Sequence, residues 1–147
     1  MPTRRRAVII ERVAGAVPVA LPSRATPGSA CFDLCAAEST DLTRTAVTLV
    51  RTGFRMRAPP GTFLEVRPRS GLSSKGVLVV NAPGTIDRDY SGEVLVPMTY
   101  LFEGTYRIQA GDRIGQLRVV EDLPTSVRLG KVRAARSRVG GFGSTGR

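Results

Sequence analysis

The chain has 147 residues, of which 22 are Lys or Arg, 12 are Asp or Glu and none is His, and its formal net charge is +10. This length fits a single domain that buries about two-thirds of its unfolded surface. The charge favours an anionic partner without choosing among nucleic acid, an acidic membrane surface and a phosphorylated small molecule. The absence of histidine excludes imidazole as a general base, so hydrolysis would need a carboxylate, a thiolate or a metal-bound water.

The cysteines and the hydropathy pattern both indicate an intracellular protein. Cys31 and Cys35 fall in one expected strand, where a disulfide is excluded because residues at this spacing lie roughly 13 Å apart and a bridge needs about 4.4–6.8 Å. We expect both to be buried as small apolar groups. No stretch resembles a secretion signal or a membrane span, since the apolar run at 13–21 is short and contains Pro18. We therefore expect a cytoplasmic or nuclear protein that is not secreted and has no membrane partner.

Sixteen glycines and ten prolines favour short strands and many turns over long helices. The pattern is clearest at 62–68, where Leu64 and Val66 alternate with charged residues as in a strand with one covered face. The expected strands are residues 7–13, 30–36, 45–50, 53–57, 62–68, 77–80, 93–102, 105–109 and 114–120, with 85–87 extended. We predict one all-β domain, formed by two packed sheets or a distorted barrel, with one short helix near Gly71.

The predicted helix begins beside two polar residues, Arg69 and Ser70. Ser70 can cap a short helical turn whose free backbone N–H groups suit an anion, and Arg69 beside it would complete a phosphate cradle. The alternative is a plain helix cap next to a solvated arginine, which is the commoner outcome for such a fragment.

The stretch 81–93 carries an amide, two carboxylates with a third at its end, a tyrosine and two glycines between the apolar runs 77–80 and 94–98. This arrangement predicts a hairpin that carries a site, with a tight turn at Pro83-Gly84 and Ile86 and Asp87 on opposite faces. An ordinary polar hairpin fits the spacing equally. Earlier in the chain, Asp33 stands between apolar residues and is either an exposed strand position or a functional carboxylate.

Basic residues gather at both ends of the chain, and no acidic residue follows Asp122. A solvated tail and a tail drawn toward a polyphosphate both fit this distribution. We divide the chain into a β-domain at 1–132 and a flexible segment at 133–147, in which glycines surround Phe142. Such a segment can close over a ligand as a lid, or it is a terminus without a task.

Five stretches in series resemble the five sequence motifs of the trimeric deoxyuridine triphosphatases (dUTPases). They are residues 27–34, 68–72, 81–93, 111–117 and 140–146. The resemblance implies a jelly-roll β-barrel that assembles as a homotrimer. It also implies Mg²⁺-assisted hydrolysis of dUTP to dUMP and pyrophosphate, which keeps uracil out of DNA and supplies dUMP for dTMP synthesis.

The same resemblance implies a role for individual residues. Asp87 is the base that activates water for attack at the α-phosphate, and Asp33 contacts the metal through water. Asn81 and Gly84 bind uracil, and Tyr90 lies against the deoxyribose. The remaining substrate-binding positions are Arg69, Ser70, Gly71 and Gln116 for the phosphates, and Arg138, Phe142, Gly143 and Ser144 in the lid. Each pocket draws its first, second and fourth motifs from one subunit, the third from another and the fifth from the last.

Two departures from the family pattern stand out. Ser137 occupies the place of an arginine, and the flanking Arg136 and Arg138 are both candidates to contact the terminal phosphate. Ser91 replaces a position that is often long and polar, which bears on subunit contacts.

Three other functions remain open from the sequence. A dCTP deaminase shares the fold, although the Asp87 stretch fits the dUTPase pattern better. A dUTPase-derived binding module would engage a protein or nucleic acid through its basic ends, a partnership that dUTP hydrolysis does not require. A small nucleic-acid protein is disfavoured by the lack of interleaved aromatic residues.

Overall fold

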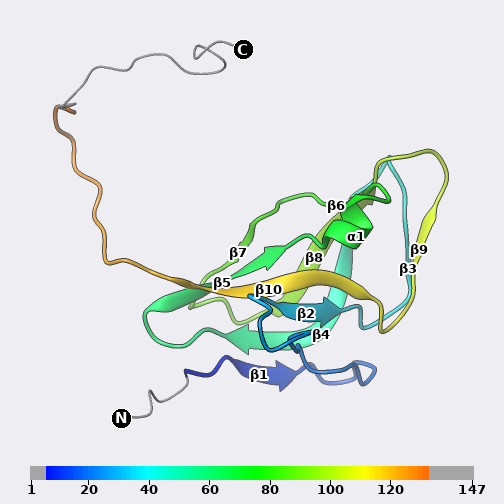
Figure 1. The fold of residues 1–147 in the computed structure, drawn as a ribbon, viewed down its shortest axis with the longest axis horizontal. Coiled ribbons are helices and arrows are strands. Elements are labelled where there is room, and N and C mark those ends of the chain that lie inside the picture. Colours follow the sequence, from blue (N-terminus) through cyan, green and yellow to red (C-terminus); the bar gives the residue numbers. More distant parts are fainter. Residues whose placement is uncertain (1–5, 133–147) are drawn as a thin grey trace.

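The computed structural model describes residues 6–132, and within them the protein is almost entirely β, as predicted (Figure 1). Its elements are β1 (Ile9–Arg12), β2 (Phe32–Cys35), β3 (Thr40–Leu42), β4 (Thr48–Arg57), β5 (Thr62–Arg67), α1 (Ser70–Ser73), β6 (Val77–Val79), β7 (Gly84–Ile86), β8 (Glu93–Tyr100), β9 (Tyr106–Ile108) and β10 (Arg113–Glu121). No helix among these residues is long and apolar enough to cross a membrane.

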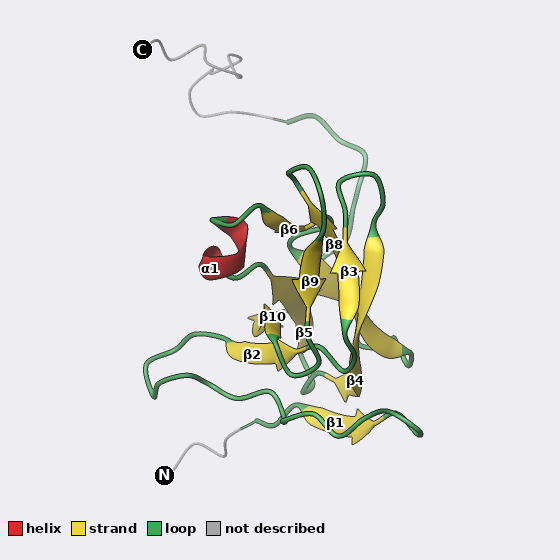
Figure 2. Cartoon of the chain, turned by 90° about the vertical axis from the view of Figure 1, so that its right-hand side faces the viewer, coloured by secondary structure: helices red, strands yellow, loops and turns green. Residues whose placement is uncertain are grey.

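The strands form two four-stranded antiparallel sheets, in the orders β1-β4-β8-β6 and β2-β10-β5-β7. A smaller ribbon pairs β3 with β9 (Figure 2). The sheets do not close into a continuous barrel, because each keeps its own edge strands. The predicted all-β class with one short helix is confirmed.

The core lies between the two large sheets and is mainly aliphatic. In β5, Leu64 and Val66 are buried while Glu65 between them is not, which confirms the alternation seen in the sequence. Among the described residues Phe54 is the only aromatic side chain in the fully buried group. Burying each such side chain contributes about 1.5–3 kcal/mol, so the aliphatic interior supplies most of the favourable folding free energy.

Residues 48–50 of the first expected strand and all of 53–57 belong to the single strand β4, whereas residues 45–47 precede it. The pairing of β4 with β8 shifts register between Arg51 and Arg55, and Gly53 has a φ of +74° there. A glycine at positive φ is typical of a β-bulge, so the break in the pattern marks a bulge inside one strand. The short strand β3 was missed because Leu42 is its only buried residue.

The stretch 81–93 is more than a hairpin. β6 and β8 do pair with each other, but β7 leaves their sheet and pairs with β5 in the other one. Gly84 and Ile86 are buried, so this edge strand of the second sheet turns one face toward the core. The predicted turn at Pro83-Gly84 is therefore wrong at Gly84, which is the first residue of β7.

The cysteines are free but only half buried, so the expected full burial is not met. Partial burial raises the pKa of the Cys35 thiol, and the neighbouring Asp33 carboxylate raises it further. A thiol with a raised pKa is a poor nucleophile. This weakens the Cys35 thiolate as a source of hydrolytic chemistry.

Candidate active site

A group of charged and polar side chains gathers where β2, β10 and the start of α1 meet. Asp33 is at its centre, and its side chain is only 11% exposed. The guanidinium groups of Arg69 and Arg113 lie 3.5 and 3.4 Å from the carboxylate oxygens, and the amide nitrogen of Gln116 lies 3.5 Å from Oδ1. We call Asp33, Arg69, Arg113 and Gln116 the phosphate cluster, after the role that the sequence predicts for Arg69 and Gln116.

The phosphate cluster joins three of the sequence motifs in one chain. Gln116 lies directly opposite Asp33 across the β2–β10 pair, and Arg69 also donates to the backbone carbonyl of Arg113 at 3.0 Å. One carboxylate between two guanidinium groups leaves the cluster with excess positive charge. The ion-pair distances exceed those of tight charge-assisted bonds, so the arginines are oriented but can turn toward an incoming anion. Sequence reasoning missed Arg113, although it lies in the fourth motif.

The start of α1 lies beside this cluster. Arg69 is the N-cap, and no side chain caps the helix, so the predicted cap at Ser70 is wrong by one residue. The reason is that the amides of Leu72 and Ser73 both bond to the Arg69 carbonyl, which makes Ser70 the first helical residue. Ser70 and Gly71 are exposed, and the first N–H groups of a helix have no acceptor within it.

Asp87 follows β7 and is exposed while Ile86 is buried, in agreement with the predicted opposite faces. It lines a cleft of about 200 Å³ together with Tyr90, a residue that is 47% exposed, and with residues of β7 and β8. The Tyr90 amide donates to the Asp87 carbonyl at 3.2 Å, and the Tyr90 hydroxyl donates to the Glu93 carbonyl at 2.9 Å. A Cβ on Gly92 would lie 2.5 Å from the Tyr90 hydroxyl oxygen, so only glycine allows the ring to fold back here.

Asn81 and Gly84 also come together, as the sequence predicts. A Cβ on Gly84 would lie 3.2 Å from the Asn81 amide nitrogen and 3.3 Å from its oxygen. The glycine lets the amide lie directly over the backbone, where a methyl group would push it away by a few tenths of an ångström. This places one side-chain amide and a backbone segment at the entrance to β7, where they can offer both donors and acceptors to a planar ring.

Within one chain these two regions are well separated. Gln116 lies opposite Arg67 on β5, whereas Ile86 lies opposite Leu64 on the same strand. Asp87, one residue beyond Ile86, is therefore roughly 13 Å farther along the sheet. From these positions, one phosphate group cannot contact both the Asp87 carboxylate and Arg69, which is paired with Asp33. The predicted lid residues Arg136, Arg138, Phe142, Gly143 and Ser144 lie outside the described residues.

The structure therefore defines an all-β protein of two antiparallel sheets, with an arginine-rich cluster in one region and an exposed carboxylate in another. The sequence model of the dUTPase family matches residues 18–146. The deoxyuridine 5'-triphosphate nucleotidohydrolase of Caulobacter vibrioides is 42% identical over 147 residues, covering 95% of this chain and 94% of its own length. The chain therefore belongs to the dUTPase family, as its five motifs predict.

Solved structures share the fold. The dUTPase of Staphylococcus bacteriophage 80alpha with dUPNHPP has a TM-score of 0.80 and 23% identity, covering 95% of this chain and 98% of that one. The dUTPase of phage phi11 of S. aureus, described with a structural Mg(II) ion, has a TM-score of 0.73 and 20% identity, covering 86% of this chain and 97% of that one.

The carboxylate of Asp33 fits a metal ion that is held mainly by the phosphates of a bound substrate. Among the described residues there is no group of three or more His, Cys, Asp or Glu placed to hold a metal ion. Mg²⁺ usually keeps several waters and binds through one or two carboxylates together with substrate phosphates. Asp33, already paired with two arginines, suits contact through water better than direct ligation.

Proposed function

We propose that this dUTPase-family enzyme hydrolyses dUTP to dUMP and pyrophosphate, with Asp87 as the general base. The observation that carries the proposal is the exposed Asp87 carboxylate in a cleft with Tyr90, in a chain whose family membership names the reaction. Asp87 takes a proton from a water molecule, which attacks the α-phosphorus, and pyrophosphate leaves with the broken bond's electrons. Assistance by a positioned base contributes about 10²- to 10⁴-fold.

The phosphate cluster supports binding of the triphosphate. Arg69 and Gln116 present donors that stabilise negative charge as it develops on the phosphate oxygens, and Ser70 and Gly71 add the first amides of α1. Arg113 joins this set because its guanidinium already faces the same carboxylate as Arg69. Asp33 would hold Mg²⁺ through water, and the bound metal would supply further neutralisation of phosphate charge.

Base and sugar selection fall to the entrance of β7 and to Tyr90. The Asn81 amide and the backbone at Gly84 can pair with uracil, and cytosine would leave buried donors and acceptors unpaired because its pattern is exchanged. The Tyr90 ring, folded back over Gly92, would lie against the deoxyribose and leave no room for a 2′-hydroxyl. These contacts would favour deoxyuridine over deoxycytidine and uridine, and a narrow mouth of the 81–93 hairpin would exclude the methyl group of thymine.

A shared site in a homotrimer accounts for the separation of the two regions. Asp87 of one copy would face the phosphate cluster of another, and residues 140–146 of the remaining copy would close the pocket. The roughly 13 Å between these regions along one chain supports this arrangement. Arg138 and Phe142 would then act on a nucleotide held by two other copies.

The test is release of pyrophosphate from dUTP, dTTP, dCTP and UTP, with and without Mg²⁺. The proposal expects rapid release from dUTP with Mg²⁺ and little from the others. Ammonia release from dCTP would instead show a deaminase on the same fold. Equal release from all four nucleotides would contradict the assigned selection.

A further inference from the structure

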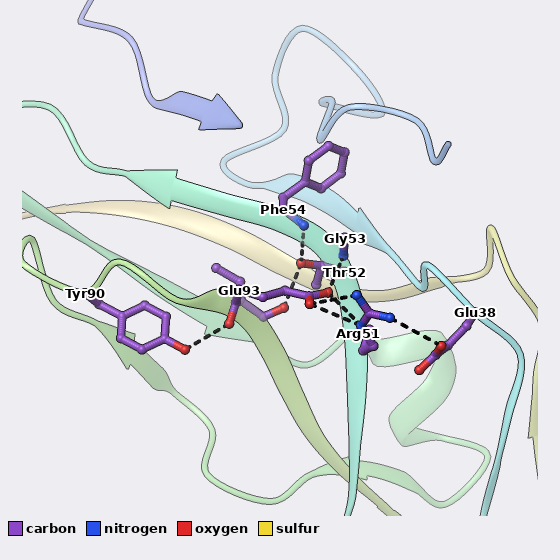
Figure 3. Close-up of polar contacts among 8 residues, drawn as sticks. Glu38, Arg51, Thr52, Gly53, Phe54, Tyr90 and Glu93 are labelled. Carbon is purple, nitrogen blue, oxygen red and sulfur yellow. Dashed lines mark hydrogen bonds and ion pairs between the residues drawn. The ribbon is translucent and has the colours of Figure 1, made fainter. Parts of the chain in front are cut away.

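The loop that carries Asp87 and Tyr90 ends at Glu93, which the mechanism does not use. Glu93 is the first residue of β8, and its side chain is 15% exposed. Arg51 donates from Nε to both carboxylate oxygens at 3.2 and 3.1 Å, and its terminal nitrogen lies 3.0 Å from Oε2. The Gly53 amide donates to Oε1 at 2.8 Å. Both oxygens of this carboxylate are therefore occupied by donors from β4 (Figure 3).

These contacts fall at the β4 bulge, where the ordinary ladder bonds between β4 and β8 are interrupted. Three residues of β4 separate Arg51 from Arg55, whereas one residue of β8 separates their partners Leu95 and Glu93. Glu93 binds the amide that the bulge frees at Gly53, and the Thr52 hydroxyl donates to the carbonyl of Val94 at 2.7 Å. The side chains of Glu93 and Thr52 thus replace the missing ladder bonds where β8 begins.

The same residue also supports the Asp87 loop from its backbone. The Tyr90 hydroxyl donates to the Glu93 carbonyl, and the Tyr90 amide donates to the Asp87 carbonyl. Figure 3 shows the Tyr90 hydroxyl directed at the Glu93 backbone while the Glu93 side chain reaches the opposite way, to Arg51 and Gly53. A continuous path of bonds therefore runs from the β4 bulge through Glu93 and Tyr90 to Asp87.

We propose that Glu93 is a positioning residue, whose carboxylate anchors the Asp87 loop to the β4 bulge and thereby sets where Asp87 and Tyr90 face the nucleotide. This inference rests on the proposed function, which makes Asp87 the base and Tyr90 the sugar contact. Arg51 is the partner that fixes the anchor, because its planar fork spans both carboxylate oxygens. An oxygen of Glu38 lies 3.7 Å from the other terminal nitrogen of Arg51, so Glu38 contacts the arginine and not Glu93.

The test compares Glu93→Gln with Glu103→Gln, a matched change at an exposed ion pair with Arg44. Glutamine keeps the size of the side chain but turns one acceptor into a donor facing Arg51 or Gly53. We measure kcat and KM for dUTP, the ratio of kcat/KM for dUTP over UTP, and the melting temperature. Displacing a catalytic base by about 1 Å can lower the rate by about 10²-fold. We therefore expect kcat to fall roughly 10- to 100-fold.

We expect the dUTP/UTP ratio of Glu93→Gln to fall as well, with KM for dUTP changing less than kcat, while Glu103→Gln matches wild type. A lowered melting temperature with unchanged kcat and ratio for the folded protein would overturn the inference, because it would show a purely structural role. If Glu93→Gln does not fold, Arg51→Lys decides, since it keeps the charge and loses the fork. It should lower kcat and the ratio in the same direction, and wild-type values would overturn the inference.

A double variant tests the path itself. Tyr90→Phe removes only the hydroxyl that bonds to Glu93, so adding it to Glu93→Gln should cost less than the product of the two single effects. Full additivity would mean that Glu93 does not act through Tyr90. Wild-type protein that releases no pyrophosphate from dUTP would overturn the proposed function and this inference together, whereas an active wild type with unaffected variants would overturn the inference alone.

Discussion

The phosphate cluster and the Asp87 loop are held in opposite ways. In the cluster, the side chains contact one another, with Asp33 between Arg69 and Arg113. In the loop, the support comes from the backbone and from Glu93 behind it, and Asp87 makes no ion pair with any described residue. The proposed roles fit this difference, because the cluster's donors share one anion, whereas the Asp87 carboxylate would act on a water molecule. Under the proposed function, the groups of an anion-binding cluster can contact one another, whereas the base is held in place by residues behind its loop.

Replacing the base should give the largest effect. Asp87→Asn keeps the size of the side chain but removes the proton acceptor, so kcat for dUTP should fall by about 10²- to 10⁴-fold. Binding of a non-hydrolysable dUTP analogue, measured by calorimetry, should stay close to wild type. Asp41→Asn, at an exposed pair with Arg107, is the matched control. Near-normal turnover in Asp87→Asn would remove Asp87 from the mechanism.

The phosphate cluster should respond differently. Arg69→Gln removes a charged donor whose Nε lies 3.5 Å from Asp33, and loss of one preorganised donor costs about 10²- to 10³-fold in turnover. Analogue binding should weaken in this variant, unlike in Asp87→Asn. Arg107→Gln, an exposed arginine on β9, should leave both quantities unchanged. If Arg69→Gln binds the analogue as wild type does, the assignment of the cluster to the phosphates fails.

The bulge that anchors the loop offers a smaller test, on stability. Gly53→Ala places a Cβ 3.3 Å from that of Ala37 at a φ of +74°, whereas Gly61→Ala has the same φ and open space around it. The left-handed conformation alone costs about 1–2 kcal/mol for alanine. We expect denaturant unfolding to show that loss in Gly61→Ala and a larger one in Gly53→Ala. Equal losses would mean that the bulge tolerates the added methyl group.

The smallest effect should come from a surface pair outside both regions. Glu103 lies 2.9 Å from Arg44, and the two side chains are 81% and 55% exposed. Exposed pairs of this kind contribute about 0–1 kcal/mol. Glu103→Gln should therefore leave unfolding and turnover near wild type, and a large change in either would show that the pair supports more than the surface.

The sequence predicts the strands whose apolar residues alternate. The grouping of Asp33, Arg69 and Gln116 comes from the resemblance to the family motifs, and the structure brings the three side chains together. The sequence does not predict where β7 pairs, since Thr85 and Ile86 suit either sheet and only packing selects β5. The sequence around Gly53 predicts a break between two strands, because glycine is favoured both in turns and in β-bulges.

Arg113 and Glu93 were missed for a related reason. Each is a charged residue at the first position of a strand, a place where a solvated side chain is the ordinary outcome. Their roles depend on partners distant in the sequence, since Arg113 meets Asp33 and Glu93 meets Arg51. Such contacts become visible only when the strands are paired.

The central claim is that Asp87 of one copy acts on a nucleotide held by the phosphate cluster of another. The direct test denatures and reassembles a 1:1 mixture of Asp87→Asn and Arg69→Gln, each nearly inactive alone, and measures pyrophosphate release from dUTP. Random assembly should place an intact Asp87 opposite an intact Arg69 in about a quarter of the sites, restoring about a quarter of wild-type turnover. No recovery in a reassembled, correctly sized oligomer would show that both residues serve the same nucleotide from one chain.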